Sequence, residues 1–482
     1  MPLYVYNTLT RRKEEFKPRE PGKVSIYVCG VTPYNFCHVG NARPYLVWDV
    51  FRRYFAYKGY SVRYIQNFTD VDDKIINKAK EEGVSALAVA DRYIREYFAD
   101  MDALGIQRAD VYPRVTDHIP DIIRVVEALV KSGHAYVLGG DVYYSVESFP
   151  EYGKLSGRSL DELKAGARIE VNEEKRHPMD FALWKAAKEG EPAWDSPWGP
   201  GRPGWHIECS VMALKYLGEG FDFHGGGSDL IFPHHENEIA QSEAYTGTAF
   251  ARYWVHNGFV NMGGEKMAKS VGNVVRVRDV LAEFPGAALR YYMLSTHYRS
   301  PIDFRLEEMP AAKRGWERLK LLEENLARAL DGREAAAPAE VSPEARAFLA
   351  KLDNLKASFE AAMDDDLNTA QALAVLFELA RELNAYLAQG DISGERAYVL
   401  SRGRDLFLKL GGVLGLTGIQ ASGRENAELV DGLLALVVEL RQEARKRRDF
   451  AAADRVRDRL AELGVILEDT PQGTRWRFAP RG

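Results

Sequence analysis

The sequence has few cysteines, no long apolar run and no strong excess of one charge. Its 482 residues include only three cysteines (Cys29, Cys37 and Cys209), too few and too widely spaced for a disulfide framework. No stretch approaches the roughly 18 apolar residues of a membrane-spanning helix. The 41 glycines and 21 prolines are too few for a fibrous chain, and 11% aromatic residues exclude a disordered one. We therefore expect a globular protein of a reducing compartment.

The net charge and the first residues of the chain further restrict the kinds of protein that the sequence can be. The chain has 64 basic and 70 acidic residues, a net charge of −6, so any nucleic-acid surface has to be a local basic patch. The segment MPLYVYNTLTRRKEEF carries charges where a secretory signal has its apolar core. We expect a cytoplasmic protein that does not bind membranes. At roughly 100–200 residues per domain, its length indicates about three domains.

The first third of the chain alternates strand and helix patterns. Lys23–Gly30 is a short β-branched run closed by glycine, and Ala42–Tyr57 places apolar residues at helical spacing. Tyr60–Asn67 has the pattern of a second strand. Strand, turn, helix and strand in this order form a βαβ unit, which implies an α/β fold with a parallel sheet.

The rest of the chain divides by composition. Residues from about Tyr136 to Pro203 combine short paired strands with a segment rich in Trp, Pro and Gly, and they indicate an insertion into the sheet domain. After Pro285 the patterns are helical, with an Ala- and Pro-rich linker at Asp331–Pro343. A break at Ala421–Arg424 precedes two amphipathic helices, expected at about 427–448 and 450–463, and a hairpin-like end.

Two short motifs suit phosphate binding. The strand-to-helix turn CGVTPYNFCHVGN places His38 and Asn41 three residues apart, so both can face an anion held at the helix N-terminus. The segment GEKMAKS carries Lys266 and Lys269 on a glycine-containing loop, which suits a polyanion that gains charge during a reaction. A plain βα turn and a solvated surface loop are the alternatives for the two motifs taken alone.

A third set of residues has the ligand types of a zinc site. Cys209 lies in GWHIECS, His234 and Glu238 lie four residues apart in FPHHENEIA, and Cys29 ends the first strand. Two thiolates, one imidazole and one carboxylate are all standard Zn²⁺ ligands. Taken singly, each cysteine also fits a small buried apolar position. His235, Glu236 and Asp229 fit ordinary surface or supporting positions.

The order of these motifs resembles one family. CHVGN, GWHIECS, FDFHGGGSDLIFPHHENEIAQSEA and KMAKS follow one another as in class I aminoacyl-tRNA synthetases, and specifically as in cysteinyl-tRNA synthetases. HVGN stands where the family has HIGH, and KMAKS where it has KMSKS. NFTDVDDKII, ALRYYMLSTHYR, MDDDLNTAQAL and EDTPQGTRWRF are also similar to family segments, so the resemblance covers essentially the whole chain.

The resemblance implies an architecture and a reaction. The fold is expected to be a Rossmann-type parallel-sheet catalytic domain with an insertion, an α-helical bundle that binds tRNA, and a small C-terminal domain. The expected parts are a first catalytic half at 1–135, a connective insertion at 136–203, a second catalytic half with the zinc site and KMAKS loop at 204–270, a stem-contact region at 271–330, a helical bundle for the anticodon stem at 331–420, and an anticodon-binding domain at 425–482. The expected reaction activates L-cysteine with ATP and Mg²⁺ and transfers it to the terminal adenosine of tRNA(Cys).

The resemblance also assigns roles to individual residues. One Zn²⁺ per chain is expected on Cys29, Cys209, His234 and Glu238, while Cys37 has a structural role. Trp205 and Thr69 are expected at the amino-acid pocket. ATP is expected to lie among His38, Asn41, the Gly225–Gly227 loop, Asp229, Lys266 and Lys269, with His38, Asn41 and the two lysines as catalytic residues.

Two positions depart from the family motifs. Asn41 replaces the last histidine of HIGH but keeps a hydrogen-bond donor on a short side chain. Ala268 replaces the first serine of KMSKS, so one hydroxyl is lost while both lysines remain. These changes bear on loop behaviour and ATP affinity rather than on the reaction itself.

The zinc accounts for the choice between cysteine and serine. A hydrophobic pocket separates such similar side chains by only about 1–3 kcal/mol. Zn²⁺ strongly prefers a thiolate and drives its deprotonation, so we expect the substrate sulfur to bind the metal directly. The insertion is small and poor in candidate catalytic residues, and no editing site is expected there.

The C-terminal end is expected to bind RNA. Between Arg441 and Arg459 the chain has eight basic and four acidic residues, and Arg447 and Arg448 lie in this stretch. Such charge suits phosphate contacts, and Trp476, between two arginines, suits stacking on an unpaired base. A solvated helix face and a core tryptophan are the alternative. The chain is expected to act as a monomer.

Three other functions fit parts of the sequence. A ligase that joins cysteine to an amino-sugar would share the zinc and ATP residues, but it would not need the helical region and basic end. A zinc hydrolase would keep an open metal position, and HHENE is not the HExxH motif. A non-catalytic RNA-binding paralogue would not need His38, Lys266 and Lys269.

Overall fold

The computed structural model describes residues 2–160, 162, 174–267, 272–330, 338–390, 392, 394–418, 423–447, 449–462, 465–470 and 473–478. Two compact units make up the chain, Met1–Gly418 and Ile419–Gly482. Within the described ranges, no helix combines the length and apolarity needed to cross a bilayer.

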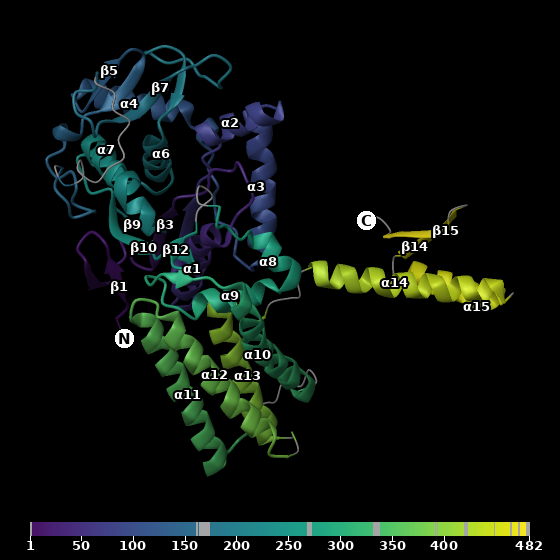
Figure 1. Ribbon diagram of the computed structural model, residues 1–482. Coiled ribbons are helices and arrows are strands. Elements are labelled where there is room, and N and C mark those ends of the chain that lie inside the picture. Colours follow the sequence, from purple (N-terminus) through teal and green to yellow (C-terminus); the bar gives the residue numbers. More distant parts are fainter. Residues whose placement is uncertain are drawn as a thin grey trace. The chain divides into compact units, whose positions relative to one another are not determined.

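A four-stranded parallel sheet forms the centre of the first unit (Figure 1). Its strands, in the order β10-β9-β3-β4, are β10 (Ala251–Asn257), β9 (Phe221–Gly227), β3 (Lys23–Val28) and β4 (Ser61–Gln66). Val28 pairs with Gly225, and Gly225 pairs with Val255, so the strands end at one common edge. This parallel sheet, with its strands ending at one edge, confirms the expected α/β fold.

Side-chain alternation along β3 divides the interior into two cores. Ile26 and Val28 belong to one apolar cluster, and Tyr27 and the following Cys29 belong to the other, because successive residues of a strand face opposite sides. On the first side lies α1 (Val39–Tyr57), whose Trp48 and Phe51 pack near Phe223 of β9. Cys29 is thereby directed away from α1.

The second face of the sheet is covered by helices and by the insertion. The helices that share this core are α4 (Ile119–Lys131), α6 (Trp205–Leu217) and α7 (Glu236–Thr246). The insertion forms an antiparallel sheet of β5 (Ala135–Leu138), β6 (Asp141–Tyr144), β7 (Phe181–Ala186) and β8 (Gly201–Pro203). This sheet lies at the end of the unit opposite the helical bundle (Figure 1).

Smaller elements surround the central sheet. The further strands are β1 (Tyr4–Asn7), β2 (Arg12–Glu15), β11 (Val260–Met262), β12 (Glu265–Lys266) and β13 (Ile302–Asp303). The further helices are α2 (Asp73–Glu82), α3 (Ala86–Ala103), α8 (Val277–Glu283) and α9 (Gly286–Leu294). Single turns of helix are η1 (Val115–Asp117), η2 (Val146–Ser148), η3 (Ser228–Leu230), η4 (Ile231–His235) and η5 (Leu306–Glu308).

A bundle of four helices completes the first unit. It consists of α10 (Met309–Leu330), α11 (Pro343–Asp364), α12 (Thr369–Leu387) and α13 (Glu395–Leu414). Buried leucines recur at helical spacing on α10, at 319, 322, 326 and 330, and they join the core of the sheet domain. Arg290 of α9 links the two parts, because it contacts Asp49 of α1 and donates to the carbonyl of Leu414 at 2.6 Å.

The second unit is a helical hairpin followed by two strands. Its elements are α14 (Gly423–Lys446), α15 (Phe450–Glu462), β14 (Val465–Thr470) and β15 (Gly473–Phe478). The first helix begins four residues before the sequence-based start at 427, and the strands pair antiparallel as a hairpin. Leu434, Leu460 and Val465 form its small buried core.

Candidate active site

The candidate metal ligands meet at the carboxyl edge of the parallel sheet. Cys29 follows β3, Cys209 comes from the first half of α6, and His234 and Glu238 come from η4 and α7. Ligands in open α/β folds bind at this edge, outside the carboxyl ends of the strands. Residues separated by up to 209 positions are thus brought to one point.

The four ligand atoms lie within 4.8 Å of one another, and all four residues are buried. Sγ of Cys29 lies 3.7 Å from Sγ of Cys209 and 3.5 Å from Oε1 of Glu238. Nε2 of His234 lies 3.0 Å from the same oxygen. Two sulfurs, one imidazole nitrogen and one carboxylate oxygen at this spacing fit the donor set of a tetrahedral zinc site.

The charges of the cluster also suit a cation. The hydrogen bond from Cys29 and the neighbouring His234 lower the pKa of Cys209 to about 6, although burial opposes this shift. Burial and the Cys209 thiolate raise the pKa of Cys29. Burial alone would raise the pKa of Glu238, but His224 and His234 lower it to about 2. Burial opposes the shift, but Glu238 and Cys209 raise the pKa of His234 to about 10, so in the metal-free cluster its imidazolium balances the negative charges that a bound cation would otherwise balance.

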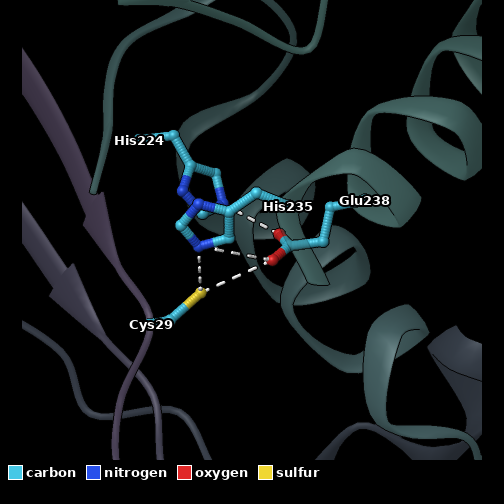
Figure 2. Close-up of side chains that lie close together, drawn as sticks. All are labelled: Cys29, His224, His235 and Glu238. Atoms are coloured by element: carbon cyan, nitrogen blue, oxygen red, sulfur yellow. Dashed lines mark hydrogen bonds and ion pairs between the residues drawn. The ribbon is translucent and has the colours of Figure 1, made fainter. Parts of the chain in front are cut away.

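Three further histidines surround the ligands. Nε2 of His224 lies 2.8 Å from Oε2 of Glu238, and Nε2 of His235 lies 3.3 Å from Sγ of Cys29 (Figure 2). Nδ1 of His206 lies 2.9 Å from Nδ1 of His234, which leaves Nε2 of His234 facing the cluster. Burial lowers the pKa of His206 and His235 well below the ordinary range, so both rings are neutral and can orient their neighbours.

Cys29, His224, His235 and Glu238 form a second group of four ligand types, the group drawn in Figure 2. This group shares Cys29 and Glu238 with the first group but has only one thiol. His235 is also engaged through Nδ1, which lies 2.8 Å from Nε2 of His256. The first group, with two sulfurs, has the softer donor set and fits zinc better.

The two residues expected at the amino-acid pocket lie beside this cluster. The Trp205 ring stacks on that of His234 with centroids 4.3 Å apart, and the Trp205 residue is 42% exposed. Thr69 is buried and donates a 3.0 Å hydrogen bond to Oε2 of Glu208. Asn67 lies between Thr69 and Cys209, with its side-chain atoms 3.5 Å and 3.7 Å from them. Both expected residues therefore adjoin the candidate metal ligands.

A cavity of about 440 Å³ opens next to the cluster. Its wall contains one candidate metal ligand, Cys29, and most of the residues expected around ATP: His38, Asn41, Gly227, Asp229 and Lys266. The structure thus brings together the CHVGN turn, the glycine segment of β9 and the first lysine of KMAKS. Ala268 and Lys269 lie outside the described residues.

The CHVGN turn is held in place by a reciprocal cap at the start of α1. The backbone N–H of Asn41 donates to Nδ1 of His38 at 3.2 Å, and the N–H of His38 donates to Oδ1 of Asn41 at 3.4 Å. This is a capping box in which histidine and asparagine replace the usual serine and glutamate. Because Nδ1 accepts, a neutral His38 ring carries its proton on Nε2.

Lys266 lines the same cavity as this turn. Its Nζ lies 3.0 Å from Oδ2 of Asp229 and 4.5 Å from the centre of the Phe259 ring. The side chains of Lys266 and Asp229 are each nearly half exposed, so this ion pair is weak and can open for a ligand.

At two glycines of β9 an added Cβ would meet a nearby side chain, and at Gly225 the buried Trp48 ring leaves no room for it. A Cβ at Gly225 would lie 2.0 Å from the Trp48 ring, and one at Gly227 would lie 2.5 Å from Oδ1 of Asp229. The FDFHGGG segment therefore brings bare backbone to the edge where the cavity and the ligands meet.

The residues expected to contact tRNA belong to the second unit. Arg447 is exposed and pairs with Glu443 at 2.8 Å. Arg448 and the side chain of Trp476 lie outside the described residues. The backbone of Trp476 pairs with Leu467 in the β14–β15 hairpin.

Sequence reasoning missed several polar residues of the site. His206, His224, His256 and Glu208 were not singled out, and Glu236 and His235 were expected to be ordinary surface or supporting residues; five of the six are buried, and His206 is half-buried. His224 lies at the middle of β9 and His256 near the end of β10, toward the carboxyl edge where ligands collect in such sheets.

Family comparisons cover most of the chain. Residues 15–314 match the family described as "tRNA synthetases class I (C) catalytic domain". Residues 358–418 match "DALR domain", and residues 430–477 match "Cysteinyl-tRNA ligase anticodon binding domain".

Curated relatives match over nearly their full length. The chain is 58% identical to the cysteine–tRNA ligase of Pelotomaculum thermopropionicum over 486 residues, which cover 98% of this chain and 99% of the relative. It is 57% identical to that of Moorella thermoacetica, with 98% and 100% covered. Among solved structures, the Mycobacterium tuberculosis methionyl-tRNA synthetase in complex with methionyl-adenylate has the same fold, with a TM-score of 0.58 at 18% identity over 82% of this chain and 90% of that one.

Proposed function

The chain belongs to the cysteinyl-tRNA synthetases of class I, and we propose that it joins L-cysteine to tRNA(Cys) in two steps driven by ATP. In the first, the cysteine carboxylate attacks the α-phosphate of ATP and expels pyrophosphate. In the second, a ribose hydroxyl of the terminal adenosine of tRNA attacks the adenylate carbonyl and releases AMP. The observation that carries the proposal is the buried Cys29/Cys209/His234/Glu238 cluster beside the cavity, in a chain so similar to cysteine–tRNA ligases.

We assign Cys29, Cys209, His234 and Glu238 as the ligands of one Zn²⁺. A zinc ion held there supplies a soft Lewis acid that prefers a thiolate to an alcohol. His224 holds one oxygen of Glu238 and His206 holds Nδ1 of His234, so both side chains keep their ligand atoms toward the metal position. Trp205, stacked on His234, and Thr69, held by Glu208, then form the sides of the amino-acid pocket.

ATP, with Mg²⁺ on its phosphates, is proposed to occupy the 440 Å³ cavity. His38 donates through Nε2, and Asn41 donates through its amide, to phosphate oxygens near the start of α1. Lys266, together with Lys269, stabilises the charge that develops on pyrophosphate. These groups do little covalent chemistry; their contribution is to position an in-line attack.

The helical bundle and the second unit are proposed to bind tRNA. The second unit matches an anticodon-binding domain. In its described part, Arg445 and Lys446 are the last residues of α14, and Arg447 follows them directly. Arg448 and Trp476 are included as further contacts. One chain is proposed to be the active unit, because a single compact unit supplies the described residues of the cluster and the cavity wall.

Pyrophosphate exchange tests the first step, and tRNA charging tests the second. The protein should exchange labelled pyrophosphate into ATP with L-cysteine and not with L-serine, and it should then charge tRNA(Cys). Lys266→Met should lower the exchange rate by about 10²-fold, because one cation is lost from the developing charge. Lys313→Met, a change on α10 outside the cavity, is the matched control and should leave the exchange rate unchanged. Exchange with cysteine followed by ligation to an amino-sugar, without charging of tRNA, would contradict the proposal.

A further inference from the structure

Arg43 of α1 carries a buried charge that no described carboxylate neutralises. Its side chain is 1% exposed, and its guanidinium donates only to backbone carbonyls. The acceptors are the oxygens of Gly258 at 2.8 Å, Phe259 at 2.9 Å, Ser300 at 2.6 Å and His297 at 3.4 Å. Among the described residues, its Nε is buried without a partner.

Other buried arginines in the first unit are arranged differently. Arg290 also donates to carbonyls but contacts Asp49, and Arg202 contacts Asp73 and Glu191. Burial lowers the pKa of Arg43 to about 10, so the guanidinium is still charged at neutral pH. An isolated buried cation is unfavourable for folding, and its presence is understandable if an anion binds nearby.

The carbonyls that Arg43 holds belong to the wall of the cavity. Gly258 and Phe259 both line it, and so do Asn41 and Pro44, which lie within two residues of Arg43 on α1. The Phe259 ring also supports Nζ of Lys266 at 4.5 Å. Arg43 therefore lies directly behind the wall, and it fixes the residue on which the lysine of the cavity rests.

We propose that Arg43 is a positioning residue for the phosphates of ATP. It holds the Gly258–Phe259 wall in place, and through the Phe259 ring it also positions Lys266. In addition, it supplies a fixed positive charge behind the phosphates. The inference rests on the proposed occupation of this cavity by ATP. A charge set in a low-dielectric wall acts more strongly than one in water, and it needs no rearrangement when the anion arrives.

Binding and kinetics of Arg43→Gln and Arg43→Lys test the proposal. Arg43→Gln should raise the Kd for Mg·ATP, measured by calorimetry without cysteine, by about tenfold or more. The KM for cysteine and the zinc content should stay near the wild-type values, because Arg43 contacts none of the ligands. Arg43→Lys keeps the charge but has one donor group in place of two, so it should recover part of the ATP affinity.

Arg19→Gln is the matched control. The Arg19 guanidinium donates to the carbonyls of Leu217 and Glu219 but does not line the cavity. This variant should bind ATP like the wild type.

A second variant tests the wall without removing the charge. A Cβ at Gly258 would lie 2.6 Å from the carbonyl oxygen of Ser300, so Gly258→Ala should displace the segment and weaken ATP binding more than cysteine binding. If Arg43→Gln does not fold, the Kd for Mg·ATP of Gly258→Ala and of Arg43→Lys tests the proposal instead.

Unchanged ATP affinity in folded Arg43→Gln would overturn the proposal. An equal loss of ATP binding and cysteine binding would also overturn it, because such a loss would show that Arg43 has only a structural role. A wild-type protein that binds ATP but shows no cysteine-dependent exchange would contradict the proposed function while leaving the effect of Arg43 on ATP measurable.

Discussion

Nε2 of His224 lies 2.8 Å from Oε2 of Glu238, and both side chains are fully buried. The other oxygen of this carboxylate, Oε1, faces Nε2 of His234 and Sγ of Cys29. The two oxygens of Glu238 therefore have separate partners: one is held by a strand residue, and one points into the ligand cluster. A ligand fixed in this way does not have to be reoriented when a metal binds.

Replacement of His224 should weaken zinc binding without removing a ligand. We expect His224→Ala to lower zinc affinity by about 10- to 100-fold, the usual effect of losing a group that orients a ligand. Competition with a chromogenic chelator measures this. His134→Ala is a suitable control, since His134 lies in the turn between α4 and β5 and contacts Ser148. Zinc affinity equal to that of the wild type would show that Glu238 does not need His224.

The cysteines should differ in their effect on metal content. Cys209→Ala should remove most of the zinc and abolish cysteine-dependent pyrophosphate exchange, because a sulfur ligand is lost. Cys37→Ala should keep the zinc, since Cys37 lies in the apolar core on the α1 side of the sheet and is not part of the ligand cluster. Elemental analysis of the two purified variants measures the difference. If zinc-free protein still rejected serine as the wild type does, the metal would not be the source of specificity.

The contrast between these residues shows what the sequence could and could not predict. Cys29, Cys209, His234 and Glu238 could be selected by ligand type and by the family resemblance. His224 and His256 could not be connected with them, because strand patterns do not show that β9 lies between β3 and β10. The parallel βαβ unit itself was predictable, since its strand and helix periodicities are local. Side-chain partners far apart in the chain are set by packing, which local periodicity does not encode.

His256 should make the stability of the metal-free protein depend on pH. Burial lowers its pKa to about 3, whereas an unfolded histidine titrates near 6.5. Between these values only the unfolded state binds the proton, so the contribution of His256 is complete above pH 6.5 and is lost as the pH falls toward 3. On going from pH 7 to 5.5, the free energy of unfolding should fall by about 1.3 kcal/mol more in the wild type than in His256→Gln. Urea unfolding at both pH values measures this difference, and equal losses would show that His256 is protonated in the folded protein.

Glu236 should hold the insertion on α7. Its buried carboxylate accepts hydrogen bonds from the backbone N–H groups of Gly153, Leu155 and Ser156, at 3.0, 3.2 and 2.7 Å. Glu236→Ala leaves three backbone N–H donors unpaired, two of them in buried residues, and should cost about 2–4 kcal/mol of stability, measured by urea unfolding. Glu151→Ala, which removes an exposed partner of Lys154, should cost less than about 0.5 kcal/mol. Similar effects of the two changes would mean that water replaces these hydrogen bonds in the variant.

Removal of the second unit should separate the two steps of the reaction. A chain that ends at Gly418 keeps the first compact unit, and with it the ligand cluster and the cavity. Cysteine-dependent pyrophosphate exchange should therefore stay within about twofold of the wild type. Charging of tRNA(Cys) should fall by about 10²-fold or more at low tRNA concentration, because the basic residues proposed to neutralise tRNA phosphates are lost. The defect should grow smaller as tRNA is raised, since the truncation affects tRNA binding and leaves adenylate formation intact. An equal loss of exchange and charging would instead mean that the second unit supports the fold of the first.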